Sequence, residues 1–70
     1  MEERINELVG KEVNVILYDG RILWPLIVHP KNENDVWPVR NICNSVYISK
    51  NTVSAIDGNF IYLGMDVIVH

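Results

Sequence analysis

The segment from Val13 to Val28 constrains the fold most, because it reads as two β-strands joined by a tight turn. Side chains in residues 13–18 alternate between two faces, one of them strongly apolar, and residues 22–28 are apolar on both faces. Asp19-Gly20 lies between the two runs. This pair is a strong hairpin signal, since such turns need a positive φ that glycine adopts without steric cost. We therefore expect a β-hairpin here.

Short strand-like runs recur along the rest of the chain, separated by turn signals. The expected strands cover residues 36–42, 45–49, 52–56, 60–63 and 66–69. Lys50-Asn51 and Asp57-Gly58-Asn59 are the expected turns between them. Pro25 cannot donate to a ladder, so the second strand should be interrupted, bent or at an edge there.

Residues 2–9 are typical of a short helix that precedes all of these strands. Glu2 and Glu3 suit the positive end of the helix dipole, while Ile5 and Leu8 begin an apolar stripe that ends before Gly10. Such a short helix is unstable alone, so it should pack across an open end of a barrel. A helix followed by many short strands predicts a small all-β barrel. The expected organisation is one domain over residues 1–70: a helix at 2–9, the barrel at 11–56, and an extra hairpin or last strands at 57–70.

The size of the chain predicts that it needs support from other subunits. Its 70 residues make at most one domain, which is only marginally stable alone. The single cysteine, Cys43, excludes an internal disulfide, and His29 and His70 lack the spacing of a zinc site. We expect no metal or cofactor, so oligomerisation is the remaining support. The apolar fraction of 49% implies apolar surface for a subunit interface.

Charge and hydropathy limit the classes of partner. The net charge of −3 argues against a strong global attraction to nucleic acid. Residues 13–70 nevertheless carry four basic and five acidic groups, which leaves room for a local basic patch. No apolar run approaches the roughly 18 residues of a membrane span, and the acidic N-terminus is unlike a signal segment. We expect a cytoplasmic location without membrane attachment.

The chain resembles the Sm/LSm/Hfq family in two segments. Residues 8–21, followed by the Pro25-containing strand, look like the first part of the family signature. Residues 46–56 are similar to the second part, an apolar strand, a tight turn and another apolar strand. Residues 61–69 also fit that second part and retain its turn glycine at Gly64. The first placement is favoured, because its apolar pattern fits on both sides of the turn.

The resemblance implies a strongly bent five-stranded barrel of the Sm (SH3-like) type that closes into a homo-oligomeric ring. In the family, the strand before the second turn pairs with the strand after it in the neighbouring subunit. It also implies binding of single-stranded RNA through pore-side loops, with an aromatic side chain for stacking. The candidate RNA-binding residues are Lys31, Asn32, Asn34, Tyr47, Lys50 and Asn51.

An SH3-like structural or protein-interaction oligomer without nucleic-acid binding is the alternative. Net acidity favours it, as does the loop, which offers Lys31 and Asp35 where the family has Asp and Asn. A barrel for small ligands would need a deep pocket that this length hardly permits. No catalytic motif is present, so we expect no enzyme. Cys43 should be a small buried apolar residue, and Trp24 and Trp37 should lie in the core or an interface.

Overall fold

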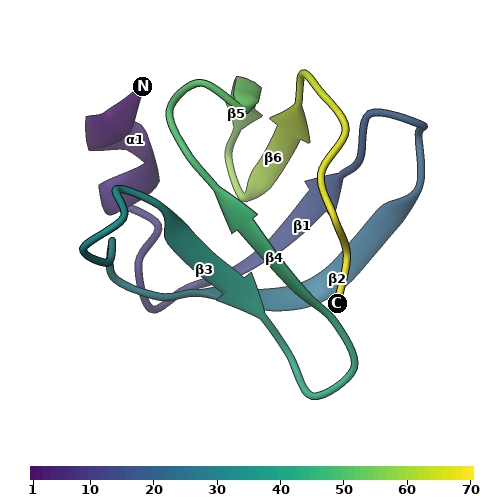
Figure 1. Ribbon diagram of the computed structural model, residues 1–70, viewed down its shortest axis with the longest axis horizontal. Helices are drawn as coiled ribbons and strands as arrows, with labels where there is room; N and C mark the ends of the chain where they lie inside the picture. Colours follow the sequence, from purple (N-terminus) through teal and green to yellow (C-terminus); the bar gives the residue numbers. More distant parts are fainter.

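A six-stranded mixed sheet, curled into a half-barrel, forms most of the structure, a computed structural model that describes residues 1–70 (Figure 1). The elements are α1 (Glu2–Asn6), β1 (Glu12–Ile16), β2 (Ile22–Val28), β3 (Trp37–Arg40), β4 (Ser45–Ile48), β5 (Val53–Asp57) and β6 (Phe60–Leu63). Their order across the sheet is β4-β3-β2-β1-β6-β5. The chain is therefore mostly β with one short helix, as the sequence predicts.

The expected hairpin between β1 and β2 is confirmed. Gly20 has φ of +93°, the positive value for which glycine is favoured. The turn is a three-residue loop, Tyr18–Gly20, closed by a 2.8 Å hydrogen bond from the Leu17 N–H to the Arg21 carbonyl. Arg21 also donates from its backbone N–H and its Nε to the Asp19 carboxylate. The Asp-Gly pair thus fixes both the turn and the start of β2.

Pro25 breaks the β1–β2 ladder, as expected, but β2 is an interior strand. The register shifts between Val13 and Val15, so Trp24 and Pro25 together stand opposite Asn14. The Trp24–Pro25 peptide bond is cis. Because the bulge contains Pro25, its missing N–H is not needed for pairing.

The sheet has six strands rather than the five expected, and one of its pairings is parallel. β5 and β6 form an antiparallel hairpin through Gly58, and β6 then pairs in parallel with β1. The prediction of a strand at residues 66–69 is wrong, because those residues belong to an irregular C-terminal tail. Because β6 lies between β1 and β5, β5 forms one edge of the sheet and β4 forms the other.

The helix is shorter than expected, ending at Asn6 instead of residue 9. The chain has to turn into β1, and Val9 forms an isolated bridge to Val28 in place of a further helical turn. Gly10 follows with φ of +83° and donates to the Val28 carbonyl at 2.8 Å. Ile5 is buried, so the apolar stripe still packs on the core.

Residues 64–70 run back across the molecule toward the start of β4, as Figure 1 shows in yellow. Ser45 and His70 exchange two backbone hydrogen bonds of 2.9 Å. Val67 and Val69 pack against the core, and the His70 and Tyr47 rings meet in a T-shaped arrangement. The tail therefore covers one end of the otherwise free edge of β4.

Fifteen apolar side chains form a single core with no buried polar group. Trp37 is in that core, as expected, and is 1% exposed. Trp24 instead lies outside it on β2. Cys43, expected to be buried, is exposed in the β3–β4 loop, because that loop extends away from the sheet.

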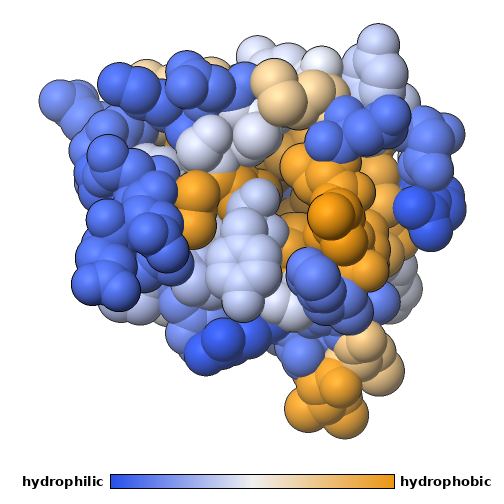
Figure 2. All heavy atoms as spheres, in the orientation of Figure 1, coloured by the Kyte–Doolittle hydropathy of each residue, from blue (hydrophilic) through white to orange (hydrophobic).

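The molecule exposes several large apolar side chains. Figure 2 shows apolar surface over the C-terminal tail and at the tip of the β3–β4 loop, where Ile42 is fully exposed.

No helix is both long and apolar enough to cross a membrane.

Candidate nucleic-acid interface

A hollow of about 330 Å³ opens beside the first turn of α1, between the β2–β3 loop and the β4–β5 turn. We call it the α1 hollow. It is lined by Glu2, Lys31, Asn34, Asp35, Val36, Trp37, Ser49, Lys50 and Asn51. Four of the six candidate RNA-binding residues therefore line one site, although they come from two segments well separated in the sequence.

The β2–β3 loop is shaped by Asn32, which does not line the hollow. The Asn32 Oδ1 accepts hydrogen bonds from the N–H groups of Asn34 and Val36, at 2.9 and 3.3 Å. The Asn32 N–H donates to the Val36 carbonyl, and Asp35 closes the loop with φ of +63°. Asn32 thus positions Asn34 and Asp35, and its own side-chain oxygen is already used.

The positive charge of Lys31 is balanced by two acidic neighbours. Its Nζ lies 2.7 Å from the Glu2 carboxylate on α1 and 3.5 Å from that of Asp35. The hydrogen bond from Lys31 lowers the pKa of Glu2, and the same bond raises the pKa of Lys31. The ammonium also lies 5.4 Å from the centre of the Trp37 ring, within cation–π range.

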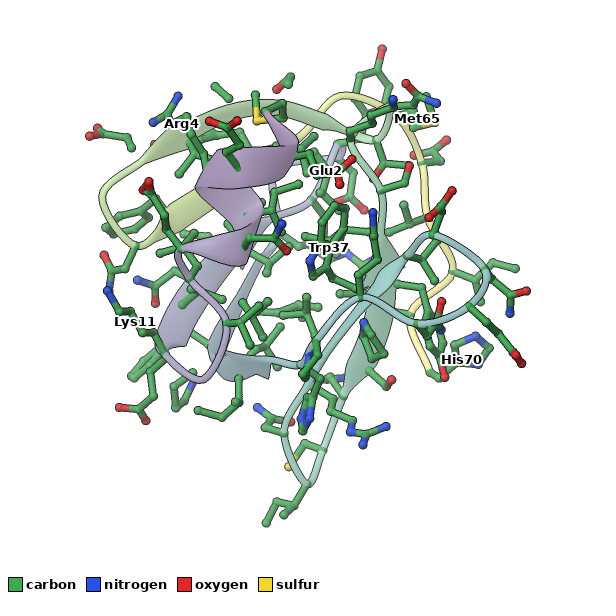
Figure 3. The ribbon with its side chains drawn as sticks, turned by 90° about the vertical axis from the view of Figure 1, so that its left-hand side faces the viewer. Glu2, Arg4, Lys11, Trp37, Met65 and His70 are labelled. Carbon is green, nitrogen blue, oxygen red and sulfur yellow. The ribbon has the colours of Figure 1, made fainter.

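Trp37 forms the floor of the site and ties α1 to the sheet. Its indole N–H donates to the Asn6 side-chain oxygen at 2.9 Å. Figure 3 shows Trp37 next to α1, with Glu2 on the same side of the helix. Because Trp37 is buried, its ring supports Lys31 and offers no open face on which a base could stack.

The β4–β5 turn presents Lys50 and Asn51 at its tip. The Thr52 hydroxyl accepts from the Ser49 N–H at 2.8 Å and donates to the Ser49 carbonyl at 3.0 Å. The Asn51 N–H donates to the Ser49 hydroxyl at 3.3 Å. These bonds fix the backbone of the turn. The Lys50 ammonium at its tip belongs to none of the ion pairs of the structure.

Tyr47 does not reach the α1 hollow. It lies on the outward side of β4, 45% exposed, in a T-shaped contact with the His70 ring at a centroid distance of 6.2 Å. A stacking role for Tyr47 would therefore have to operate on the face that also holds the C-terminal tail.

The formal charges lining the α1 hollow cancel. Lys31 and Lys50 face Glu2 and Asp35, and Lys50 lies close enough to Glu2 to help lower its pKa. The site can offer amide and hydroxyl groups from Asn34, Asn51 and Ser49, together with one free ammonium. It is suited to polar contacts with a ligand and only weakly to charge attraction.

Sequence reasoning missed Glu2 as a member of this site. Glu2 lies 29 residues from Lys31, and its acidic character was already explained by the helix dipole. Asp35 carried a signal, since it follows Lys31 by four residues in the same loop. No group of three or more metal-ligating side chains occurs in the structure.

Comparison with protein-family models, with curated proteins and with solved structures gave no match to this chain.

Proposed function

We propose that this chain is a ring-forming Sm-like protein that binds single-stranded RNA at the α1 hollow. The observation that supports this most directly is the convergence of Lys31, Asn34, Lys50 and Asn51 on one opening. The resemblance to the Sm/LSm/Hfq family implies all four of these residues as RNA contacts. Their amides and the Lys50 ammonium suit base edges and phosphate oxygens respectively.

The strand arrangement also supports assembly through edges. β4 and β5 are joined by a short turn, yet they lie at opposite ends of the sheet. This favours residues 46–56 over 61–69 as the second motif. Pairing β4 of one subunit with β5 of the next is a heterologous contact, which closes into a ring when the rotation between subunits permits. The tail contact at Ser45 leaves the rest of β4 for such pairing.

Binding of RNA by a single subunit should be weak. Lys31 is held by Glu2 and Asp35, so Lys50 alone is free to neutralise a phosphate in each hollow. Sites repeated around a ring would then supply affinity through multivalency. The logarithm of the binding constant should fall by about 0.7 per decade of salt for each phosphate neutralised.

Fluorescence anisotropy with labelled oligo-U and oligo-A at low salt tests the proposal. We expect a Kd tighter than about 10⁻⁶ M, weakened by Lys50→Ala and by added salt. Lys11→Ala is the matched control, because Lys11 lines a different hollow near Gly58. Binding no tighter than the non-specific range of about 10⁻⁴–10⁻⁶ M, or an equal loss from both substitutions, would contradict an RNA site at the α1 hollow.

A protein-interaction oligomer without nucleic-acid binding is the second candidate. The cancelled charges of the α1 hollow favour it, and so does the exposure of Trp24 and Ile22 on the outside of β2. Such an interface should resist salt, because apolar contacts are not screened. Salt-resistant assembly together with absent RNA binding would select this candidate.

A further inference from the structure

We propose that the outer surface of β2, β1 and β6 is a dimerisation face on which a second copy of this chain packs. We call it the outer apolar face. Its large members are Ile16, Ile22, Trp24, Phe60 and Tyr62. β1 and β2 lie behind β3 and β4 in Figure 1, so this face is turned away from the viewer there.

The ladder pairing places these side chains side by side. Ile22 pairs with Ile16, and Ile16 pairs with Tyr62, which gives one apolar row across three strands. Trp24 and Phe60 lie in the neighbouring row, on either side of β1. The strand neighbours Val15, Ile61 and Leu63 are buried and Leu23 packs against the core, so alternation directs Ile16, Ile22, Phe60 and Tyr62 outward. Trp24 lies in the bulge opposite Asn14 and is itself exposed.

The exposed area of the face is large for so small a protein. Trp24 is 68% exposed, Ile22 54%, Phe60 39% and Tyr62 38%. With about 200 Å² for a whole large apolar side chain, these four expose roughly 400 Å². That lies within the range of about 300–600 Å² for the largest apolar patch of a typical monomer, and it is about half of one side of a standard protein interface, near 800 Å². Flanking residues can supply the remainder.

The chemistry of the face fits a second copy of itself. Its centre carries no formal charge, and Asn14 is the polar side chain between its apolar members. Glu12 lies at the end of β1, outside the apolar rows. A partner must therefore present an uncharged apolar surface of similar extent, which the same face of another copy does. Two sheets packed face to face with nearly aligned strands are an established arrangement.

The charges at the flanks agree with a two-fold axis parallel to the strands. Arg40 lies on β3 beyond β2, and Asp57 lies on β5 beyond β6. Both are exposed and neither belongs to an ion pair within the chain. The two-fold operation brings the β3 flank of one copy over the β5 flank of the other, so Arg40 approaches the partner copy's acidic flank twice in each dimer.

This dimer does not depend on the proposed ring. The ring would use the edges of β4 and β5, whereas the dimer uses the face of the sheet. The ring contact is heterologous and the dimer contact is isologous. Variants of the outer apolar face should therefore weaken one contact and leave the other intact.

Sedimentation equilibrium of the wild type and face variants tests the proposal. We expect Trp24→Ser to raise the dimer dissociation constant at least about thirtyfold, as for a central aromatic hot spot. Ile22→Glu should act similarly and does not alter the bulge. Ile42→Ser is the matched control, because Ile42 is fully exposed at the β3–β4 tip, away from this face. Circular dichroism checks that each variant is folded.

The tryptophans report on the same contact independently. Trp37 is buried in the subunit, whereas Trp24 should lose its exposure only on dimerisation. Acrylamide quenching of wild-type fluorescence should therefore fall as protein concentration rises. In Ile22→Glu, quenching should stay high at every concentration.

A charge exchange tests the orientation. Arg40→Glu should weaken the dimer several-fold, and Arg40→Glu with Asp57→Arg should restore it. A wild type that stays monomeric up to about 1 mM overturns the proposal, even if the face binds some other protein. So does a dimer that Trp24→Ser and Ile22→Glu leave within about twofold of wild type. If the protein forms a ring that these variants do not affect and no face dimer is detected, the proposed function remains supported and the proposed dimer is contradicted.

Discussion

At the scale of single residues, Lys31 shows how a candidate binding residue can be occupied within its own subunit. The sequence places it in a polar loop, where a free ammonium would be expected. The structure instead surrounds it with Glu2, Asp35 and the Trp37 ring. The contribution of Lys31 to any attraction of the α1 hollow for phosphate therefore depends on how firmly Glu2 and Asp35 hold this cation, whereas Lys50 is outside these ion pairs.

Removing the Glu2 carboxylate should release Lys31 for a ligand. We expect Glu2→Gln to strengthen RNA binding about two- to fivefold at low salt, the size typical of exposed charge interactions. The gain should disappear at high salt, because the added attraction is screened. Anisotropy titrations measure it, with Glu7→Gln as the control next to α1. Equal effects of the two substitutions would place the RNA elsewhere.

The same ion pair should make stability depend on pH at the acid end. Folding lowers the pKa of Glu2 from its ordinary value of 4.5, so the unfolded chain binds more protons there. The contribution of Glu2 is fully present above pH 4.5 and is lost as the pH falls through the lower pKa of the folded state. Thermal unfolding from neutral to strongly acidic pH should show the Tm of wild type converging on that of Glu2→Gln. A difference in Tm that stays constant with pH would show that the pair does not stabilise the fold.

At the scale of elements, local patterns predicted the tight turns at Gly20 and Gly58, whereas they gave no prediction of the long-range pairing of strands. Asp19-Gly20 specified its turn because the requirement for a positive φ is local to Gly20. The parallel pairing of β6 with β1 has no comparable signal, since it depends on where the chain travels after Gly58. Residues 66–69 alternate like a strand, yet Val67 and Val69 are used to cover the core from a tail without a ladder.

The turn at Gly20 gives a direct test of the hairpin. No atom lies within 4 Å of a Cβ placed on Gly20, so a substitution there meets only the backbone penalty of its positive φ. Gly20→Ala should lower the free energy of unfolding by about 1–2 kcal/mol, measured by urea denaturation. Gly20→Asn should cost less, because asparagine tolerates this region better. Equal losses from both would mean that something other than φ selects glycine here.

The candidate site was predictable only in part for the same reason. Lys50 and Asn51 follow from a turn signal, and Lys31 and Asn34 follow from a polar loop. Their meeting beside α1, and the entry of Glu2 into the same site, result from tertiary packing around Trp37. Tyr47 failed to join them because it lies on the opposite side of its strand from the core.

At the scale of the whole molecule, the chain has more apolar surface than one small core can use. Fifteen side chains are buried, while Trp24, Ile22, Phe60 and Tyr62 remain exposed on one sheet face. Two edge strands, β4 and β5, also remain available at opposite ends of the sheet. Both features favour assembly of several subunits. The net charge of −3 argues against a strong attraction to a polyanion, so assembly is the better supported of the two properties.

The molecular mass in solution, measured by multi-angle light scattering, tests the central claim that this chain works as an oligomer. We predict a mass of at least twice the 8.1 kDa of one subunit, held at high salt by apolar contacts. A mass of two subunits supports the face dimer and contradicts the ring, whereas a larger closed assembly supports the ring and leaves the face dimer to be tested by its own variants. A stable 8.1 kDa monomer up to about 1 mM would contradict both forms of assembly.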